Sequence, residues 1–191
     1  MGKYTRVSAR SLPSGHDGRR VVLGIDPGLE RTGYALLSEV TRSPQPRVLD
    51  AGIIRLVRYQ PLERRLAQLD EGLTTLIATY RPRVLACEEL YAHYRHPRTA
   101  ILMGHARGVI LAAAARHGMA VLPLAATHVK KVLTGSGRAS KQQVQRAVAN
   151  TLGLPELPGP HDVADAIAIA LCGLWVSQRS AIGEQPAAGE R

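Results

Sequence analysis

The sequence has few of the residues that build disulfide-stapled or membrane-spanning proteins. It contains no phenylalanine and only two cysteines, Cys87 and Cys172. Two cysteines are too few for a disulfide framework, and both lie in apolar segments, so we expect buried, reduced thiols in a reducing cytosol. The longest uncharged apolar run, residues 108–115, is far shorter than the roughly 18 residues of a membrane helix. We therefore expect a cytoplasmic protein with no membrane segment.

Both ends of the chain lack the apolar patterning of the centre. Residues 1–20 have no apolar signal-peptide core and carry a net charge of +4, so we expect a flexible basic arm; an organelle transit peptide is the alternative. Residues 178–191 predict a disordered tail. Since 191 residues suit one domain, residues 21–177 are predicted to form a single domain between these ends.

Acidic residues are absent from a long central segment. None occurs between Glu89 and Glu156, whereas nine cations do. They are Arg95, Arg98, Arg107, Arg116, Lys130, Lys131, Arg138, Lys141 and Arg146. A block of one sign in a chain of net charge +10 favours a polyanionic partner, most simply nucleic acid, over the alternative of a solvated face that keeps the protein soluble.

The apolar patterning predicts an α/β protein. Short apolar runs predict strands at 21–26, 32–40, 47–56, 84–91 and 119–125. Helical spacing predicts a helix from residue 62 to Pro82 and another over 97–117, and the capping pair Ser140 and Gln143 opens one over 140–152. A last helix spans about 162–177. This order predicts a five-stranded mixed sheet with helices on both faces.

Four carboxylates are placed where they can meet. Asp26 ends the first strand and Glu88 ends the fourth, so they meet if these strands are neighbours, and Asp162 and Asp165 share one face of the last helix. Four clustered carboxylates need a cation, because each negative charge raises the pKa of the next. An all-oxygen ligand set without Cys or His spacing favours Mg²⁺ or Mn²⁺, and two such ions about 4 Å apart can drive phosphodiester hydrolysis.

Each carboxylate also has a structural interpretation. Asp26 in the sequence DPG suits a turn, and Glu88 can be an ordinary charge at a strand end. Asp162 can cap a helix, and Asp165 can favour the positive end of the helix dipole. The joint arrangement of all four in a basic chain favours the metal site.

Five motifs, in order, closely resemble the RuvC Holliday junction resolvases. They are LGIDPGLERTGYALL, ACEELY, GHARGVI, HVKKVLTGSGRASKQQVQ and HDVADAIAIA, and the resemblance covers residues 21–175. It implies a ribonuclease H-like fold, a homodimer and a Mg²⁺- or Mn²⁺-dependent hydrolase with two ions per site. It also implies symmetric nicking of two opposed strands of four-way junction DNA during recombination and repair, beside the RuvA and RuvB branch-migration proteins.

The resemblance assigns roles residue by residue. Asp26, Glu88, Asp162 and Asp165 match the family's catalytic metal ligands. Lys130 and Lys141 match its DNA-contacting lysines, and Tyr91 stands where an aromatic residue stacks on a base near the crossover. Lys141 has independent support, since free N–H groups of a first helical turn favour a phosphate. Lys131 could replace Lys130, and Tyr91 could be an ordinary strand-end tyrosine.

Departures from the family pattern concern two positions. Glu89 follows Glu88, but strand alternation points it to the other face. His161 directly precedes Asp162, and some relatives carry His at the first position of the acidic pair; the register favours Asp162 as the ligand. Gly104 and Gly108 allow close packing of their helix, either in the dimer that the resemblance implies or against the sheet.

Three other classes compete with the resolvase. Actin- and hexokinase-like ATPases share a similar turn after the first strand, but they need a second half and a second glycine-rich loop that this chain lacks. An RNA-cleaving ribonuclease H would share the carboxylates and differ in substrate. A non-catalytic junction-binding protein would not be expected to retain all four acids.

Overall fold

The computed structural model describes residues 6–8, 20–40, 43–90, 97–155 and 159–181. The elements are β1 (Arg6–Ser8), β2 (Val21–Asp26), β3 (Arg31–Val40), β4 (Ser43–Arg55), α1 (Leu62–Tyr80), β5 (Val84–Glu88), α2 (Pro97–Arg116), β6 (Ala120–Leu124), α3 (Ala126–Thr134), α4 (Lys141–Leu152) and α5 (His161–Ala181). None of the described helices is both long enough and apolar enough to span a bilayer.

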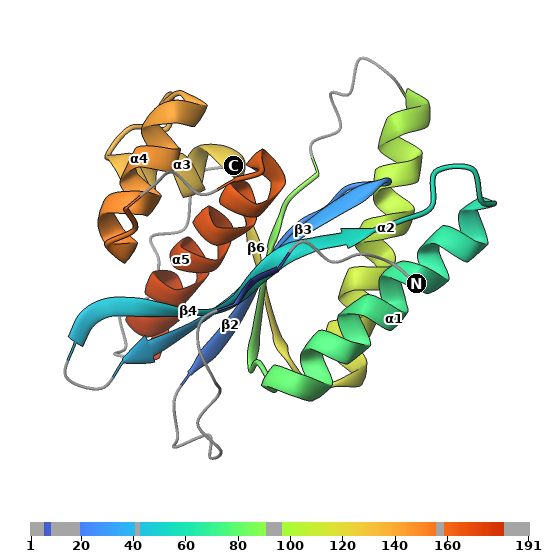
Figure 1. Cartoon of the computed structure of the whole chain (residues 1–191), viewed down its shortest axis with the longest axis horizontal. Coiled ribbons are helices and arrows are strands. Elements are labelled where there is room, and N and C mark those ends of the chain that lie inside the picture. Colours follow the sequence, from blue (N-terminus) through green and yellow to red (C-terminus); the bar gives the residue numbers. More distant parts are fainter. Residues whose placement is uncertain (1–5, 9–19, 41–42, 91–96, 156–158, 182–191) are drawn as a thin grey trace.

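The strands form one mixed sheet in the order β1-β4-β3-β2-β5-β6 (Figure 1). Strands β2, β3 and β4 pair antiparallel as a meander, whereas β2 pairs with β5, and β5 with β6, in parallel. The five predicted strands correspond to β2–β6, and the predicted mixed sheet is confirmed. A parallel connection needs a crossover, which α1 supplies between β4 and β5 and α2 supplies between β5 and β6.

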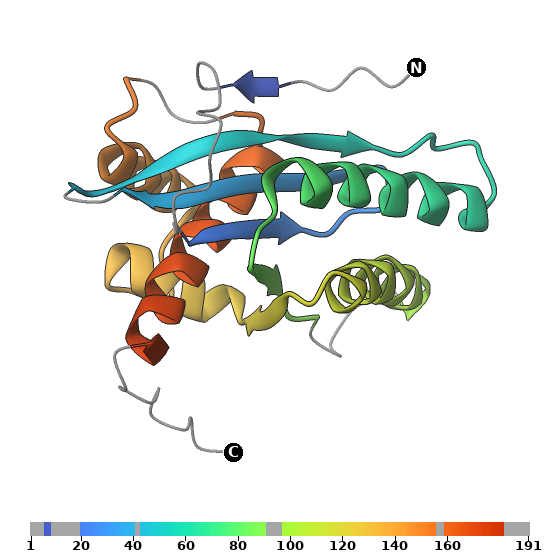
Figure 2. The ribbon, with the colours of Figure 1, turned by 90° about the horizontal axis from the view of Figure 1, so that it is seen from below.

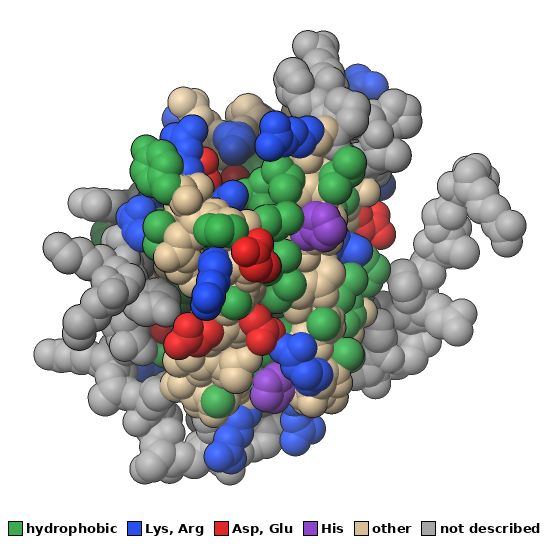
Figure 3. Space-filling model, turned by 90° about the vertical axis from the view of Figure 1, so that its right-hand side faces the viewer, with side chains coloured by type: hydrophobic (Ala, Val, Ile, Leu, Met, Phe, Trp, Pro, Cys, Tyr) green, Lys and Arg blue, Asp and Glu red, His purple; other side chains and the backbone are tan. Residues whose placement is uncertain are grey.

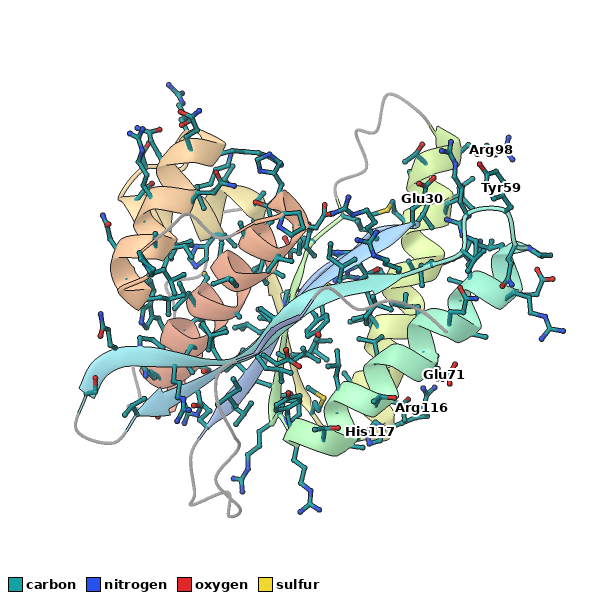
Figure 4. The ribbon with its side chains drawn as sticks, viewed as in Figure 1. Glu30, Tyr59, Glu71, Arg98, Arg116 and His117 are labelled. Atoms are coloured by element: carbon teal, nitrogen blue, oxygen red, sulfur yellow. The ribbon has the colours of Figure 1, made fainter. Side chains whose placement is uncertain are left out.

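Helices cover both faces of the sheet, as predicted (Figure 1). Side chains alternate along a strand, so Val22 packs beneath α5 while Leu23 and Ile25 pack in the core beneath α1 and α2. Arg116 at the end of α2 (Figure 4) forms an ion pair with Asp70 of α1, which links these two helices. The sheet is therefore mainly apolar on both faces; the buried Asp50 of β4 is an exception and accepts a hydrogen bond from the hydroxyl of Tyr80 of α1.

Helix α5 lies against the sheet at glycines. A Cβ added to Gly24 would come within 2.5 Å of the carbonyl oxygen of Ala166, and one added to Gly33 within 2.1 Å of the carbonyl oxygen of Asp162. No side chain fits at either position. Because Gly33 pairs with Asp26 across the β2–β3 ladder, this close approach brings the first turn of α5 to the end of β2.

The helix boundaries follow local signals. Arg81 ends α1 in the left-handed conformation, with φ 47°, just before Pro82. The capping box predicted for Ser140 and Gln143 is present at the start of α4. Helix α3, which the sequence patterning did not delimit, ends at Gly135 with φ 79°, a conformation that favours glycine.

The ends of the domain differ from the predicted boundaries. Residues 6–8, expected within a flexible arm, pair with β4 at the edge of the sheet (Figure 2). Helix α5 continues to Ala181 instead of stopping at residue 177. Its last turns are held by Arg20, which donates to the carbonyl of Ser177, and by Gln178, which donates to Glu39. The rest of the predicted arm and tail lies outside the described residues.

Candidate metal centre

Asp26 and Glu88 lie side by side at the ends of neighbouring parallel strands. The register of β2 and β5 pairs Ile25 with Cys87, so the next residue on each strand is one of the two carboxylates. The condition on which the sequence made their meeting depend, that the two strands are neighbours, is thus met. Glu88 lines the pocket at this edge of the sheet and Glu89 does not, as the alternation of strand side chains requires.

Asp162 and Asp165 reach the same pocket from the first turns of α5. The cavity has a volume of about 370 Å³ and a mixed polar and apolar lining. Its lining comprises Asp26, Glu88, Ala126, Val129, Lys130, Lys141, Val144, Asp162, Asp165, Ala168 and Ile169. The fold thus gathers all four predicted carboxylates, from three separate elements, around one opening.

The carboxylates perturb one another. The pKa of Asp26 is raised to about 7 from its ordinary value of 3.8, chiefly by burial and then by the charges of Asp165, Glu88 and Asp162. The pKa of Glu88 is also raised, by burial first and by Asp165 second. Lys141 opposes both shifts. The pocket therefore holds more negative charge than its own lysines offset, which favours binding of a cation.

Two cations already contact the carboxylates of α5. Lys141 Nζ lies 3.2 Å from Asp165 Oδ2, and this contact raises the pKa of the lysine. Arg31 Nε lies 2.9 Å from Asp162 Oδ2. Sequence reasoning missed Arg31. Its signal is the hairpin LGIDPGLERTG, which returns the chain antiparallel to β2 and so sets Arg31 beside the end of that strand.

Of the remaining residues considered from the sequence, only Lys130 is found in the described pocket lining. Lys130, on α3, lines the pocket, whereas the exposed Lys131 does not. His161 Nδ1 lies 2.9 Å from Gln145 Nε2 of α4, and His161 is not part of the pocket lining, which supports Asp162 in the acidic pair. Tyr91 lies outside the described residues.

The donor set suits a hard divalent ion. Four carboxylates, with no Cys or His in the pocket lining, are oxygen donors of the kind that Mg²⁺ and Mn²⁺ prefer. In the arrangement seen, however, no three His, Cys, Asp or Glu side chains of the described segments are placed to hold one metal ion together. The pocket fits the ion by charge and chemistry, and Asp162 and Asp165 would have to turn from their cation partners to join its ligands.

Comparisons with known proteins agree on one family. The family model of crossover junction endodeoxyribonuclease RuvC matches residues 22–173. The chain is 49% identical over 156 residues to the RuvC of Rhodopirellula baltica, covering 82% of this chain and 86% of that protein. It is 40% identical over 168 residues to the RuvC of Leifsonia xyli, covering 88% and 80% respectively.

The chain is also similar in fold to solved structures. RuvC of T. thermophilus in complex with a Holliday junction substrate superposes with a TM-score of 0.78 at 32% identity, covering 84% of this chain and 96% of that one. The yeast mitochondrial Holliday junction resolvase Ydc2 superposes with a TM-score of 0.55 at 16% identity, covering 84% and 82%, a likeness of fold alone. The match to the RuvC structure, with the likeness of fold to Ydc2, confirms the predicted ribonuclease H-like fold.

Proposed function

The chain belongs to the RuvC family of crossover junction endodeoxyribonucleases, and we propose that it resolves Holliday junctions by hydrolysing phosphodiester bonds symmetrically in two opposed strands of a four-way DNA junction. The observation that carries this function is the pocket itself, in which the carboxylates of Asp26, Glu88, Asp162 and Asp165 open beside Lys130 and Lys141. An acidic centre inside a basic surface suits a reaction in which cations hold the DNA backbone and carboxylates hold metal.

We propose that the enzyme is metal-dependent through this pocket, with Mg²⁺ or Mn²⁺ held by the four carboxylates and two ions per site. Ions bound there would supply the Lewis acidity that activates a water molecule and stabilises the leaving oxygen. Burial and the neighbouring carboxylates raise the pKa of Asp26 to about 7, because its negative charge is unfavourable there, and a bound cation would stabilise that charge. Glu88, on the adjacent strand, is fixed relative to it by the sheet.

Lys141 and Lys130 bind the phosphates of the strand to be cut. Lys141 is the first residue of α4, directly after the cap Ser140, so its ammonium and the positive end of the helix dipole act on the same anion. Its side chain is exposed and reaches Asp165, so an incoming phosphate can take the place of that carboxylate. Lys130 approaches from α3. Tyr91 is proposed to stack on a base near the crossover.

Two copies acting together would explain paired cuts. We propose a homodimer that uses the exposed side of α2, where Ile101 is 62% exposed. A Cβ added to Gly104 or Gly108 would meet nothing within 4 Å, so these glycines do not serve packing on the sheet. Figure 3 shows apolar side chains interspersed with basic, acidic and histidine side chains on this side of the molecule. RuvA and RuvB are further proposed partners, and the cytoplasm is the proposed location.

The test measures cleavage of three nucleic-acid substrates by the wild-type protein and by the variant Asp26→Asn. Cleavage of a four-way DNA junction, a linear DNA duplex and an RNA–DNA hybrid is measured in Mg²⁺ or Mn²⁺, with wild type and Asp26→Asn. We expect paired nicks in the junction alone, lost in Asp26→Asn, while junction binding without metal persists. Cutting of the hybrid would move the function to an RNA-cleaving relative, and cleavage by Asp26→Asn would remove Asp26 from the site.

A further inference from the structure

Arg31 forms an ion pair with Asp162 that the proposed chemistry does not use. Arg31 Nε lies 2.9 Å from Asp162 Oδ2, and the two side chains are 43% and 34% exposed. Arg31 is the first residue of β3, two residues before Gly33, against which the first turn of α5 packs. The close packing of Gly33 on the backbone of Asp162 therefore brings Arg31 within reach of the Asp162 carboxylate.

Arg31 holds Asp162 from outside the pocket. Asp162 lines the cavity together with the other three carboxylates, but Arg31 does not. Asp165 has a comparable partner in Lys141, which does line the cavity. The difference matters for the DNA, because a phosphate entering the pocket meets Lys141 in its lining, whereas Arg31 is not part of that lining.

We propose that Arg31 is a positioning residue that competes with the metal ion for Asp162 and so sets how much metal the enzyme needs. The inference rests on the proposed function. A guanidinium and a divalent ion on one carboxylate repel each other and divide its negative charge, so the ion must displace or weaken the pair. This agrees with the finding that no three acidic or histidine side chains in the described segments are gathered to hold an ion.

The opposite role for Arg31 would be that of a tether, which holds Asp162 in place as a metal ligand. If Arg31 instead oriented Asp162 for the metal, its removal would weaken metal binding. The competitor and the tether therefore predict changes of opposite sign in the dissociation constant of the ion, and one titration separates them.

The experiment titrates Mn²⁺ into DNA-free protein and follows the electron paramagnetic resonance signal of the free ion. We expect Arg31→Gln to lower the dissociation constant about twofold to fivefold, the range for a partly exposed ion pair, with Arg31→Lys in between. The control is Arg58→Gln, which removes the same charge from an exposed pair with Glu30, a residue of the same hairpin (Figure 4). It should leave Mn²⁺ binding unchanged.

Two further measurements exclude a merely structural role. In an Asp162→Asn background, Arg31→Gln should no longer alter Mn²⁺ binding, because the pair is already broken. Without metal, Arg31→Gln should lower the melting temperature slightly, and the difference from wild type should narrow as Mn²⁺ is added.

The Mn²⁺ titrations distinguish failure of the Arg31 inference from failure of the proposed function. If wild type binds Mn²⁺ and Arg31→Gln binds it equally or more weakly, the competitor role of Arg31 is wrong and the resolvase function stands. If wild type binds no Mn²⁺ at this pocket, with Asp26→Asn giving the same titration as wild type, both proposals fail.

Discussion

Replacing Gly33 with alanine should separate the strand-borne carboxylates from those of α5. The added Cβ would lie 2.1 Å from the carbonyl oxygen of Asp162 and 2.7 Å from its carbonyl carbon, where ordinary contact begins at 3.4 Å. The shortfall of about 1.3 Å falls on backbone of both elements, so no side chain can rotate to relieve it. The first turn of α5 must move away from Asp26.

Two effects of known size follow. Overpacking of this kind lowers the free energy of unfolding by about 1–3 kcal/mol, which urea denaturation measures. A displacement of about 1 Å in a catalytic constellation reduces the rate by roughly 10²-fold, which single-turnover cleavage of a four-way junction measures. Junction binding without metal should change little, since Lys130 and Lys141 are carried by α3 and α4.

Gly72→Ala is the matched control. Its Cβ would meet the side chain of Ile54 at 2.9 Å, on the face of the sheet away from α5. It should therefore perturb packing and leave cleavage by the folded enzyme near the wild-type rate. Wild-type stability and cleavage in Gly33→Ala would refute the claim that this contact positions Asp162, and equal losses of cleavage in both variants would assign the effect to stability alone.

The remaining predictions concern the lysines and the thiols. Lys130→Gln should weaken junction binding about equally for all DNA sequences and reduce the slope of log affinity against log salt by about 1. Lys131 does not line the pocket, so Lys131→Gln should reduce cleavage much less than Lys130→Gln does. Burial raises the pKa of Cys87 and of Cys172 to about 12, so at pH 8 only about one thiol in 10⁴ is the reactive thiolate. Both should resist Ellman's reagent in the native protein and react on unfolding in urea; rapid native labelling would contradict their burial.

The fold and most of the pocket were predictable because their signals are local. Strand ends and helix caps depend on a few neighbouring residues. Asp26 and Glu88 follow apolar runs that mark strands, and the pair Ser140 and Gln143 marks a helix start. The sequence predicted that Asp26 and Glu88 meet if their two strands are neighbours, and the parallel pairing of β2 with β5 satisfies that condition.

Contacts between distant segments were not predictable in the same way. The pair of Arg31 and Asp162 joins residues far apart in the chain and depends on how closely α5 lies on Gly33, which no periodicity reveals. The edge strand at residues 6–8 is too short to give a pattern, and it owes its conformation to the open edge of β4. Helix α3 is only nine residues long, too short for reliable periodicity.

The order of the pocket's elements along the chain has a consequence for synthesis. Asp26 and Glu88 leave the ribosome early, whereas α5, which carries Asp162 and Asp165, follows every other described element. A nascent or truncated chain that stops before residue 161 contains half of the acidic set and lacks α5, the helix that packs on Gly24 and Gly33. On the proposed roles, such a fragment cannot cut DNA, so nuclease activity begins only when the domain is completely translated and closed.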